Sequence, residues 1–169
     1  VNIAVVKEYN LEEEKNDLLN LIPESSNIDK KEVDFGDFNI EEVFFADFLG
    51  NNELKEIIEY QILTKNEAVK LLENKEITAI VILPKGFIKD TMINFGTGFR
   101  NIVNIEIIGR TDKNIGTTIV EEVMRGFTDI LSYNIAAKNT FARIYNREEI
   151  PGNITRSEER RVGKEFRYR

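Results

Sequence analysis

The residues best suited to chemistry lie between positions 34 and 48, where aromatic rings alternate with carboxylates. The rings are Phe35, Phe38, Phe44, Phe45 and Phe48, and the carboxylates among them are Asp34, Asp37, Glu41, Glu42 and Asp47. Exposed together, the rings would form a docking surface for a partner or an amphiphilic substrate. Packed inward, they would instead anchor a variable, acidic insertion over residues 31–56 on the core. Both interpretations stay open, and the five rings are our candidate interaction surface.

The same carboxylates raise the question of a calcium site. An EF-hand loop needs a glycine at its sixth position and a glutamate at its twelfth. Counted from Asp37, these positions hold Glu42 and Phe48, so the loop does not form. An irregular cation site and a solvated acidic face remain as interpretations, and we predict no metal site.

Most catalytic constellations are excluded by composition. The chain has no cysteine and no histidine, which removes thiol nucleophiles, Ser-His-Asp triads and the commonest metal ligand. No G-x-x-x-x-G-K-[ST] motif occurs, and Lys85-Gly86 is more simply a turn than a phosphate site. We therefore predict no catalytic residue, no cofactor in this chain, and neither binding nor hydrolysis of ATP.

A helix, a strand and a turn can be predicted in residues 64–87. Thr64 and Glu67 form a capping box, which predicts a helix from Lys65 that ends at Asn74-Lys75. The apolar run Ala79–Leu83 suits a strand that is covered on both faces, with Val81 and Ile82 pointing to opposite sides. Pro84 closes that strand, Gly86 permits a tight turn, and a helix begins at Phe87.

The rest of the chain repeats this alternation. Strands are predicted at residues 2–6, 57–63 and 103–107, and helices at residues 11–22, 87–93 and, as a long final helix, 114–145. Such an order predicts a layered α/β domain over residues 1–146, with a mostly parallel or mixed central sheet and helices on both faces. Residues 147–169 are predicted to be a tail that is disordered or derives from an expression vector.

Charge is distributed unevenly along the chain. The net charge is −7, yet residues 1–60 alone carry 16 acidic and 5 basic side chains. An acidic first third disfavours nucleic acid as a partner, because binding to nucleic acid depends on neutralising phosphates. The longest apolar run is also far shorter than the roughly 20 residues of a membrane helix.

The helix, the apolar strand Ala79–Leu83 and the following Lys85-Gly86-Phe87 turn resemble the extracytoplasmic domain of ABC type 2 transporter permeases, the export class. The resemblance extends to Asn2–Val6 and to the helix at 114–145. It implies a non-catalytic domain between two membrane helices, on the extracytoplasmic side of the cell membrane, which contacts substrate or a partner. It also implies a permease dimer and a separate ATPase subunit that uses ATP.

One geometric expectation follows from that resemblance. A domain inserted between two membrane helices returns both of its ends to one membrane surface, so the last turns of the long helix should project on the side where Val1 enters. Ends at opposite poles would instead favour the alternative, a free-standing cytoplasmic α/β binding or regulatory module. A third and weaker alternative is an enzyme that uses only carboxylates, which would show two close carboxylates with raised pKa values in a cleft.

Overall fold

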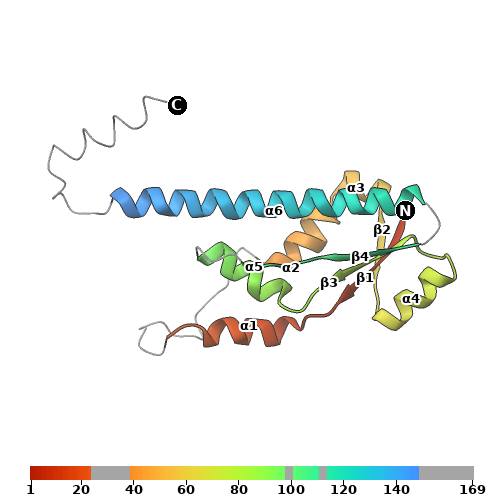
Figure 1. The fold of residues 1–169 in the computed structure, drawn as a ribbon, viewed down its shortest axis with the longest axis horizontal. Coiled ribbons are helices and arrows are strands. Elements are labelled where there is room, and N and C mark those ends of the chain that lie inside the picture. Colours follow the sequence, from red (N-terminus) through yellow and green to blue (C-terminus); the bar gives the residue numbers. More distant parts are fainter. Residues whose placement is uncertain (24–38, 98–100, 111–113, 149–169) are drawn as a thin grey trace, which may run out of the picture.

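A four-stranded sheet forms the centre of the computed structural model, which describes residues 1–23, 39–97, 101–110 and 114–148. For residue 139 and residues 141–148 it describes the helix but not the side chains. The strand order is β2-β1-β3-β4 (Figure 1), with β1 at Asn2–Lys7, β2 at Glu59–Ile62, β3 at Ala79–Leu83 and β4 at Glu106–Gly109. β1 is parallel to both β2 and β3, whereas β4 is antiparallel to β3. The predicted α/β class, with its mixed central sheet, is confirmed.

The two inner strands are buried on both faces. Every residue of β3 is buried, as are the four residues Ile3 to Val6 of β1. Because side chains alternate along a strand, Val81 joins the core on one face of the sheet and Ile82 joins the core on the other. The prediction for Ala79–Leu83 is therefore confirmed in its position, its burial and its two-sided packing.

One face of the sheet is covered by α4 (Lys65–Glu73). Thr64 and Glu67 form the predicted capping box, and Ala68 packs under the helix against the core that contains Ala4 and Ile80. The helix ends at Asn74, and Lys75 takes a left-handed conformation with φ of 63°. This helix and its two ends were readable from sequence because local chemistry alone specifies them.

The opposite face carries a larger and more aromatic core. It is covered by α6 (Ile115–Glu148), through Val120, Met124 and Phe127, and by α2 (Ile40–Glu42) with the π-helical turn η1 (Val43–Phe48). Figure 1 shows α6 above the sheet and α4 below it, so helices cover both faces as predicted. Residues 39–56, the described part of the expected variable insertion, contribute Ile40, Phe44 and Leu49 to this core.

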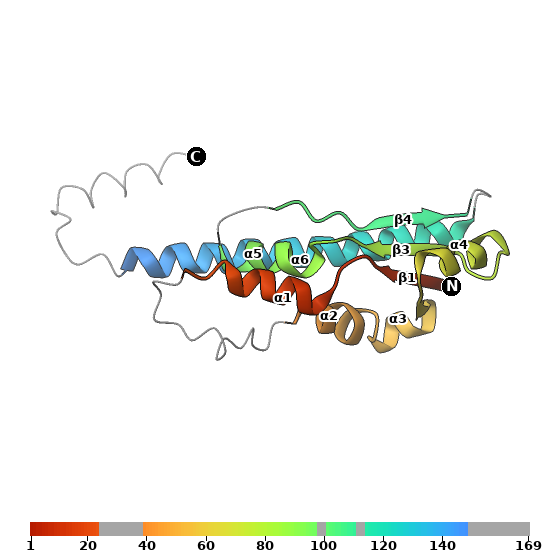
Figure 2. The same ribbon diagram turned by 90° about the horizontal axis from the view of Figure 1, so that it is seen from below.

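Two further helices lie beyond the ends of β1 and β3. They are α1 (Leu11–Asn20) and α5 (Phe87–Gly96), which lie side by side in both views (Figures 1 and 2). A short helix, α3 (Asn52–Ile57), precedes β2. α5 extends past the predicted end at Ile93, because Asn94 and Phe95 are also buried against the protein. The last strand begins later than predicted, at Glu106, although Val103 and Ile105 still pack on the core.

The expectation about the two ends of the domain is wrong. The N-terminus lies at one end of the long axis, beside the start of α6, and the last described turn of α6 lies at the other end (Figures 1 and 2). The reason is that β1 and α6 both start at the same end of the sheet and run in the same general direction. Of the predicted tail at 147–169, residues 147 and 148 continue α6, and the rest lies outside the described residues.

No helix in the described part of the chain combines the length and the apolar character that crossing a bilayer requires.

Candidate functional site

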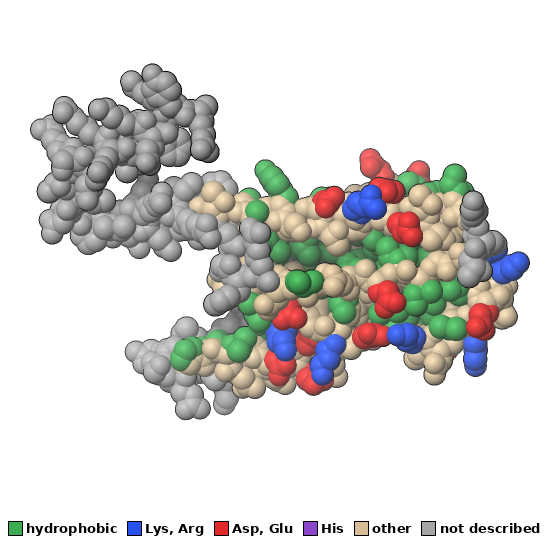
Figure 3. Space-filling view, in the orientation of Figure 1, with side chains coloured by type: hydrophobic (Ala, Val, Ile, Leu, Met, Phe, Trp, Pro, Cys, Tyr) green, Lys and Arg blue, Asp and Glu red, His purple; other side chains and the backbone are tan. Residues whose placement is uncertain are grey.

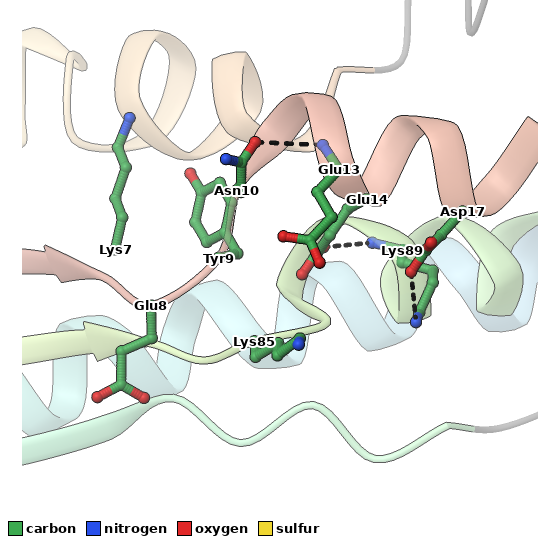
Figure 4. Close-up of a pocket in the computed structure, with 9 residues that line it drawn as sticks. All are labelled: Lys7, Glu8, Tyr9, Asn10, Glu13, Glu14, Asp17, Lys85 and Lys89. Carbon is green, nitrogen blue, oxygen red and sulfur yellow. Dashed lines mark hydrogen bonds and ion pairs between the residues drawn. The ribbon is translucent and has the colours of Figure 1, made fainter.

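A polar hollow lies where β1 and β3 end next to each other (Figure 4). The carboxyl edge of parallel strands is the usual ligand position in α/β proteins, which makes this hollow a candidate ligand site. Its volume is about 190 Å³, and it is lined by Lys7, Glu8, Tyr9, Asn10, Glu13, Glu14, Asp17, Lys85 and Lys89. Most of these side chains come from the end of β1 and from α1, while Lys85 comes from the turn before α5 and Lys89 from the first turn of that helix.

Glu14 is the one buried carboxylate of this hollow. Its side chain crosses from α1 to the start of α5, where its two oxygens accept hydrogen bonds from the backbone N–H groups of Gly86, Ile88 and Lys89, the last two at 2.9 Å. Gly86 permits this approach because its φ is +86°, a conformation that suits glycine. A helix N-terminus with free N–H groups attracts anions. Here the chain's own carboxylate already occupies that position.

A second carboxylate, Glu41 of α2, joins Lys7 and Tyr9. Lys7 Nζ forms an ion pair with Glu41 Oε1, and Tyr9 Oη donates to the same oxygen at 2.9 Å. Burial, followed by the hydrogen bond to Glu41, raises the pKa of the Tyr9 phenol far above its usual range. The phenol therefore stays protonated and serves as a donor, which fits a structural contact better than acid–base catalysis.

Three further charged side chains of the hollow form ion pairs. Lys89 Nζ lies 3.2 Å from Asp17 Oδ2, and Glu8 pairs with Lys65 of α4 at 3.0 Å. Within the described residues, no group of three histidine, cysteine or acidic side chains is placed to hold a metal ion. Several charges of the hollow are thus already paired, with each other or with residues outside it.

The structure describes three of the five rings of the candidate interaction surface, and these three differ in burial. Phe44 is fully buried, with its ring 5.9 Å from Phe87 and 5.0 Å from Phe127, so it is not part of any surface. Phe48 is half-buried against Phe127 at 4.9 Å. The reason is the turn η1, which directs these two side chains toward α6. Phe35 and Phe38 lie outside the described residues.

Phe45 is the exception within that cluster. It is half-buried and stands edge-on to Phe44 at 5.0 Å, while its other side faces Tyr60 of β2 at 5.7 Å. Together with Tyr60 and Ile62 it lines an open hollow of about 410 Å³ along the outer edge of β2. The other lining residues are Lys7, Asn39, Glu41, Glu42 and Ala46.

A third hollow lies between α5, α6 and residues 101–105. Its volume is about 110 Å³. On the face shown in Figure 3, hydrophobic side chains gather below α6. Thr91 lines the hollow, and its hydroxyl is buried without a hydrogen-bond partner among the described residues. A hollow of this size accommodates water that would satisfy the hydroxyl.

Sequence reasoning missed Glu14 and Tyr9 as site residues. Glu14 lies in α1, yet it caps the start of α5, 72 residues later. A signal was present, because Glu14 shares the inward helix face of Leu11 and Leu18, where a carboxylate needs a buried partner. No comparable signal marks Tyr9. Glu41 was noted among the acidic residues at 34–48, but its pairing with Lys7 and Tyr9 was not predicted.

Comparison with known proteins adds no relative. No family model, no curated protein and no solved structure matches this chain. The resemblance to ABC type 2 permeases therefore remains a hypothesis from the sequence.

Proposed function

We propose that this chain is a non-catalytic interaction domain, and that it serves as the extracytoplasmic domain of an ABC type 2 export permease. The observation that carries the proposal is the unit Thr64–Phe87, whose capped helix, buried strand and glycine turn are formed by the residues on which the resemblance rests. The paired charges of the hollow at β1 and β3 agree with a role in contact rather than in chemistry. The domain would contact substrate or a partner outside the membrane, within a permease dimer, while ATP is used by a separate ATPase subunit.

A second candidate, a free-standing cytoplasmic α/β binding or regulatory module, is favoured by one observation. The start of β1 and the end of α6 lie at opposite ends of the long axis (Figure 1). A permease domain would need further chain, outside the described residues, to bring both ends back to one membrane surface. The free-standing module needs no such segment.

Cysteine labelling in cells separates the two candidates, because the chain has no cysteine of its own. Glu121→Cys places a thiol on the exposed face of α6, and Val120→Cys places one in the core of the same helix as a matched control. The full-length protein is expressed, and intact and lysed cells are treated with a maleimide that does not cross membranes.

The permease proposal expects labelling of Glu121→Cys in intact cells, no labelling of the control, and sedimentation of the protein with the membrane fraction. Labelling of Glu121→Cys only after lysis, with the protein in the soluble fraction, would overturn the permease proposal and support the cytoplasmic module.

A further inference from the structure

We propose that the outer edge of β2, with the hollow beside Phe45, binds an extended basic segment of a partner polypeptide, which adds to the sheet as a fifth strand. The inference does not rest on the permease proposal, since the edge is available on either side of a membrane. Three observations carry it: unused backbone groups, a hollow on one face with Phe45, Tyr60 and Ile62 in its wall, and a surplus of negative charge.

The backbone of β2 has donors and acceptors that point away from the sheet. Glu59 donates its N–H to the carbonyl of Val1 at 2.9 Å, and Leu63 donates to Val5 at 3.1 Å. Because alternate residues of a strand point to opposite edges, Tyr60 and Ile62 direct their N–H and C=O groups outward. β2 stands at the end of the strand order, so no strand of the described residues pairs with these groups. Peptides commonly bind to such an edge through backbone hydrogen bonds.

The hollow gives the site a preference for side chains. The register pairs Tyr60 with Ile3 and Ile62 with Val5, so both side chains lie on the aromatic face of the sheet. Ile62 is 51% exposed there, beside the ring of Phe45. An added strand would place every second side chain over this face, where an apolar side chain would cover Ile62 and enter the hollow of about 410 Å³.

The charge around the edge favours a basic occupant. The stretch from Asn39 to Ile62 contains six acidic residues and one basic residue, and Lys7 is already paired with Glu41. Glu42 borders the hollow and Glu59 lies on the strand itself, both exposed. A second copy of the chain would bring two such acidic edges together, which disfavours self-pairing because like charges on adjacent strands repel.

Peptide titration tests the proposal. The probes are two synthetic peptides of about six residues, a length that suits edge addition: one alternates lysine and valine, and the other alternates glutamate and valine. Binding to the whole chain is followed by backbone amide NMR. We expect the basic probe to shift the amide signals of Tyr60 and Ile62 and the acidic probe to leave them unchanged.

Two substitutions of equal charge change provide the control. Glu42→Lys lies at the hollow, whereas Glu73→Lys lies on the exposed end of α4 on the other face of the sheet. We expect Glu42→Lys to weaken binding of the basic probe by about fivefold or more, and Glu73→Lys by less than about twofold. Equal weakening by both variants would show non-specific attraction and overturn the proposal.

Ile62→Pro tests the backbone contact when it is compared with Ile62→Ala, because both variants lose the isoleucine side chain and only proline lacks the N–H. Proline removes the outward N–H of Ile62 and leaves the bonds from Glu59 and Leu63 to β1 in place. We expect loss of probe binding with an unchanged circular dichroism spectrum. Unchanged binding would overturn the proposal, and if this variant does not fold, the Glu42 and Glu73 pair decides. Self-association of the wild-type chain in sedimentation, with shifts at Tyr60, would assign the edge to a second copy instead.

Discussion

The start of α5 lies beyond the carboxyl end of β3, whereas the outer edge of β2 runs along the side of the sheet, and the two differ in which backbone groups remain unused. At α5, the carboxylate of Glu14 accepts three backbone N–H groups, so an anion would have to displace a buried side chain. At β2, the outward groups of Tyr60 and Ile62 have no strand to pair with among the described residues. The position at the carboxyl edge therefore does not by itself mark a ligand site in this fold. The site that we propose rests instead on the outward backbone groups of β2 together with the hollow and the negative charge beside them.

Phe44 should give the largest effect, because it connects the two regions. Its ring packs on Phe87, the first residue of α5, and on Phe45 beside the edge of β2. We expect Phe44→Ala to lower the free energy of unfolding by about 3–5 kcal/mol, as truncation of a buried aromatic ring does. Urea denaturation measures the change, and Phe45→Ala, at a half-buried ring, is the control that should cost less. Equal costs for the two variants would contradict the separation of core and surface rings.

Removal of Glu14 should free the backbone N–H groups at the start of α5. Glu14→Ala leaves three N–H groups at the start of α5 without their acceptor, and we expect a loss of about 2–3 kcal/mol of stability. Sulfate should restore part of that stability in the variant but not in the wild type, because the helix N-terminus then binds an external anion.

The matched control for this experiment is Glu13→Ala, an exposed neighbour on the same helix. Thermal denaturation at constant ionic strength, with sulfate exchanged for chloride, separates the specific effect of the anion from screening. A Glu14→Ala protein as stable as Glu13→Ala would show that the contact does not hold α1 to α5.

High pH should destabilise the cluster of Lys7, Tyr9 and Glu41, which lies between the start of α5 and the outer edge of β2. The pKa of Tyr9 is raised in the folded protein, first by burial and then by Glu41. The unfolded chain therefore loses this proton near the ordinary pKa of about 10, while the folded protein keeps it. Stability is fully present below about pH 10 and falls above it by up to about 1.4 kcal/mol per pH unit.

The variant Tyr9→Phe isolates this contribution. Its stability should fall less steeply above pH 10 than that of the wild type, as measured by urea denaturation across the pH range. The pKa values of Lys65 and Lys89 are also raised, by hydrogen bonds to Glu8 and Asp17, and act in the same direction. They are common to both proteins, so a wild type and a variant with equal slopes would contradict the role of Tyr9.

The smallest effect on stability is expected at the outer edge of β2. Ile62 is 51% exposed, so Ile62→Ala should change the free energy of unfolding by no more than about 0.5 kcal/mol. The same variant should weaken binding of the lysine–valine probe, because it removes the apolar wall of the hollow. A large loss of stability would mean that Ile62 belongs to the core and that the edge is not open.

The parts of the fold that were predictable are those specified by neighbours in sequence. The capping box at Thr64 fixes the start of α4, and the apolar run to Leu83 requires burial on two faces whatever lies around it. The π-helical turn Val43–Phe48 was not predictable, because its rings are ordered by Phe87 and Phe127, which are distant in the chain. The placement of the two ends at opposite poles could not be predicted either, because it depends on the directions of β1 and α6 relative to each other. Local sequence patterns do not specify those directions.

The candidate site was less predictable than the fold, and for a related reason. Glu14 and Gly86 are 72 residues apart, and their contact exists only after α1 and α5 have packed together. The edge of β2 became recognisable only from the strand order, because the sequence does not show which strand lies outermost. Of the predicted rings, Phe45 borders this edge and Phe44 does not, although they are adjacent in the sequence.

The placement of the two ends also determines how the domain would respond to mechanical force. α6 has 34 residues, so it extends about 50 Å at 1.5 Å per residue, and it ends far from Val1. Tension applied between Val1 and the end of α6 would act roughly along β1, which is bonded to a parallel neighbour on each side (Figure 1). The ladder hydrogen bonds on both sides would then be loaded in shear and would have to break together. We therefore expect β1 to resist extraction along the long axis of the domain.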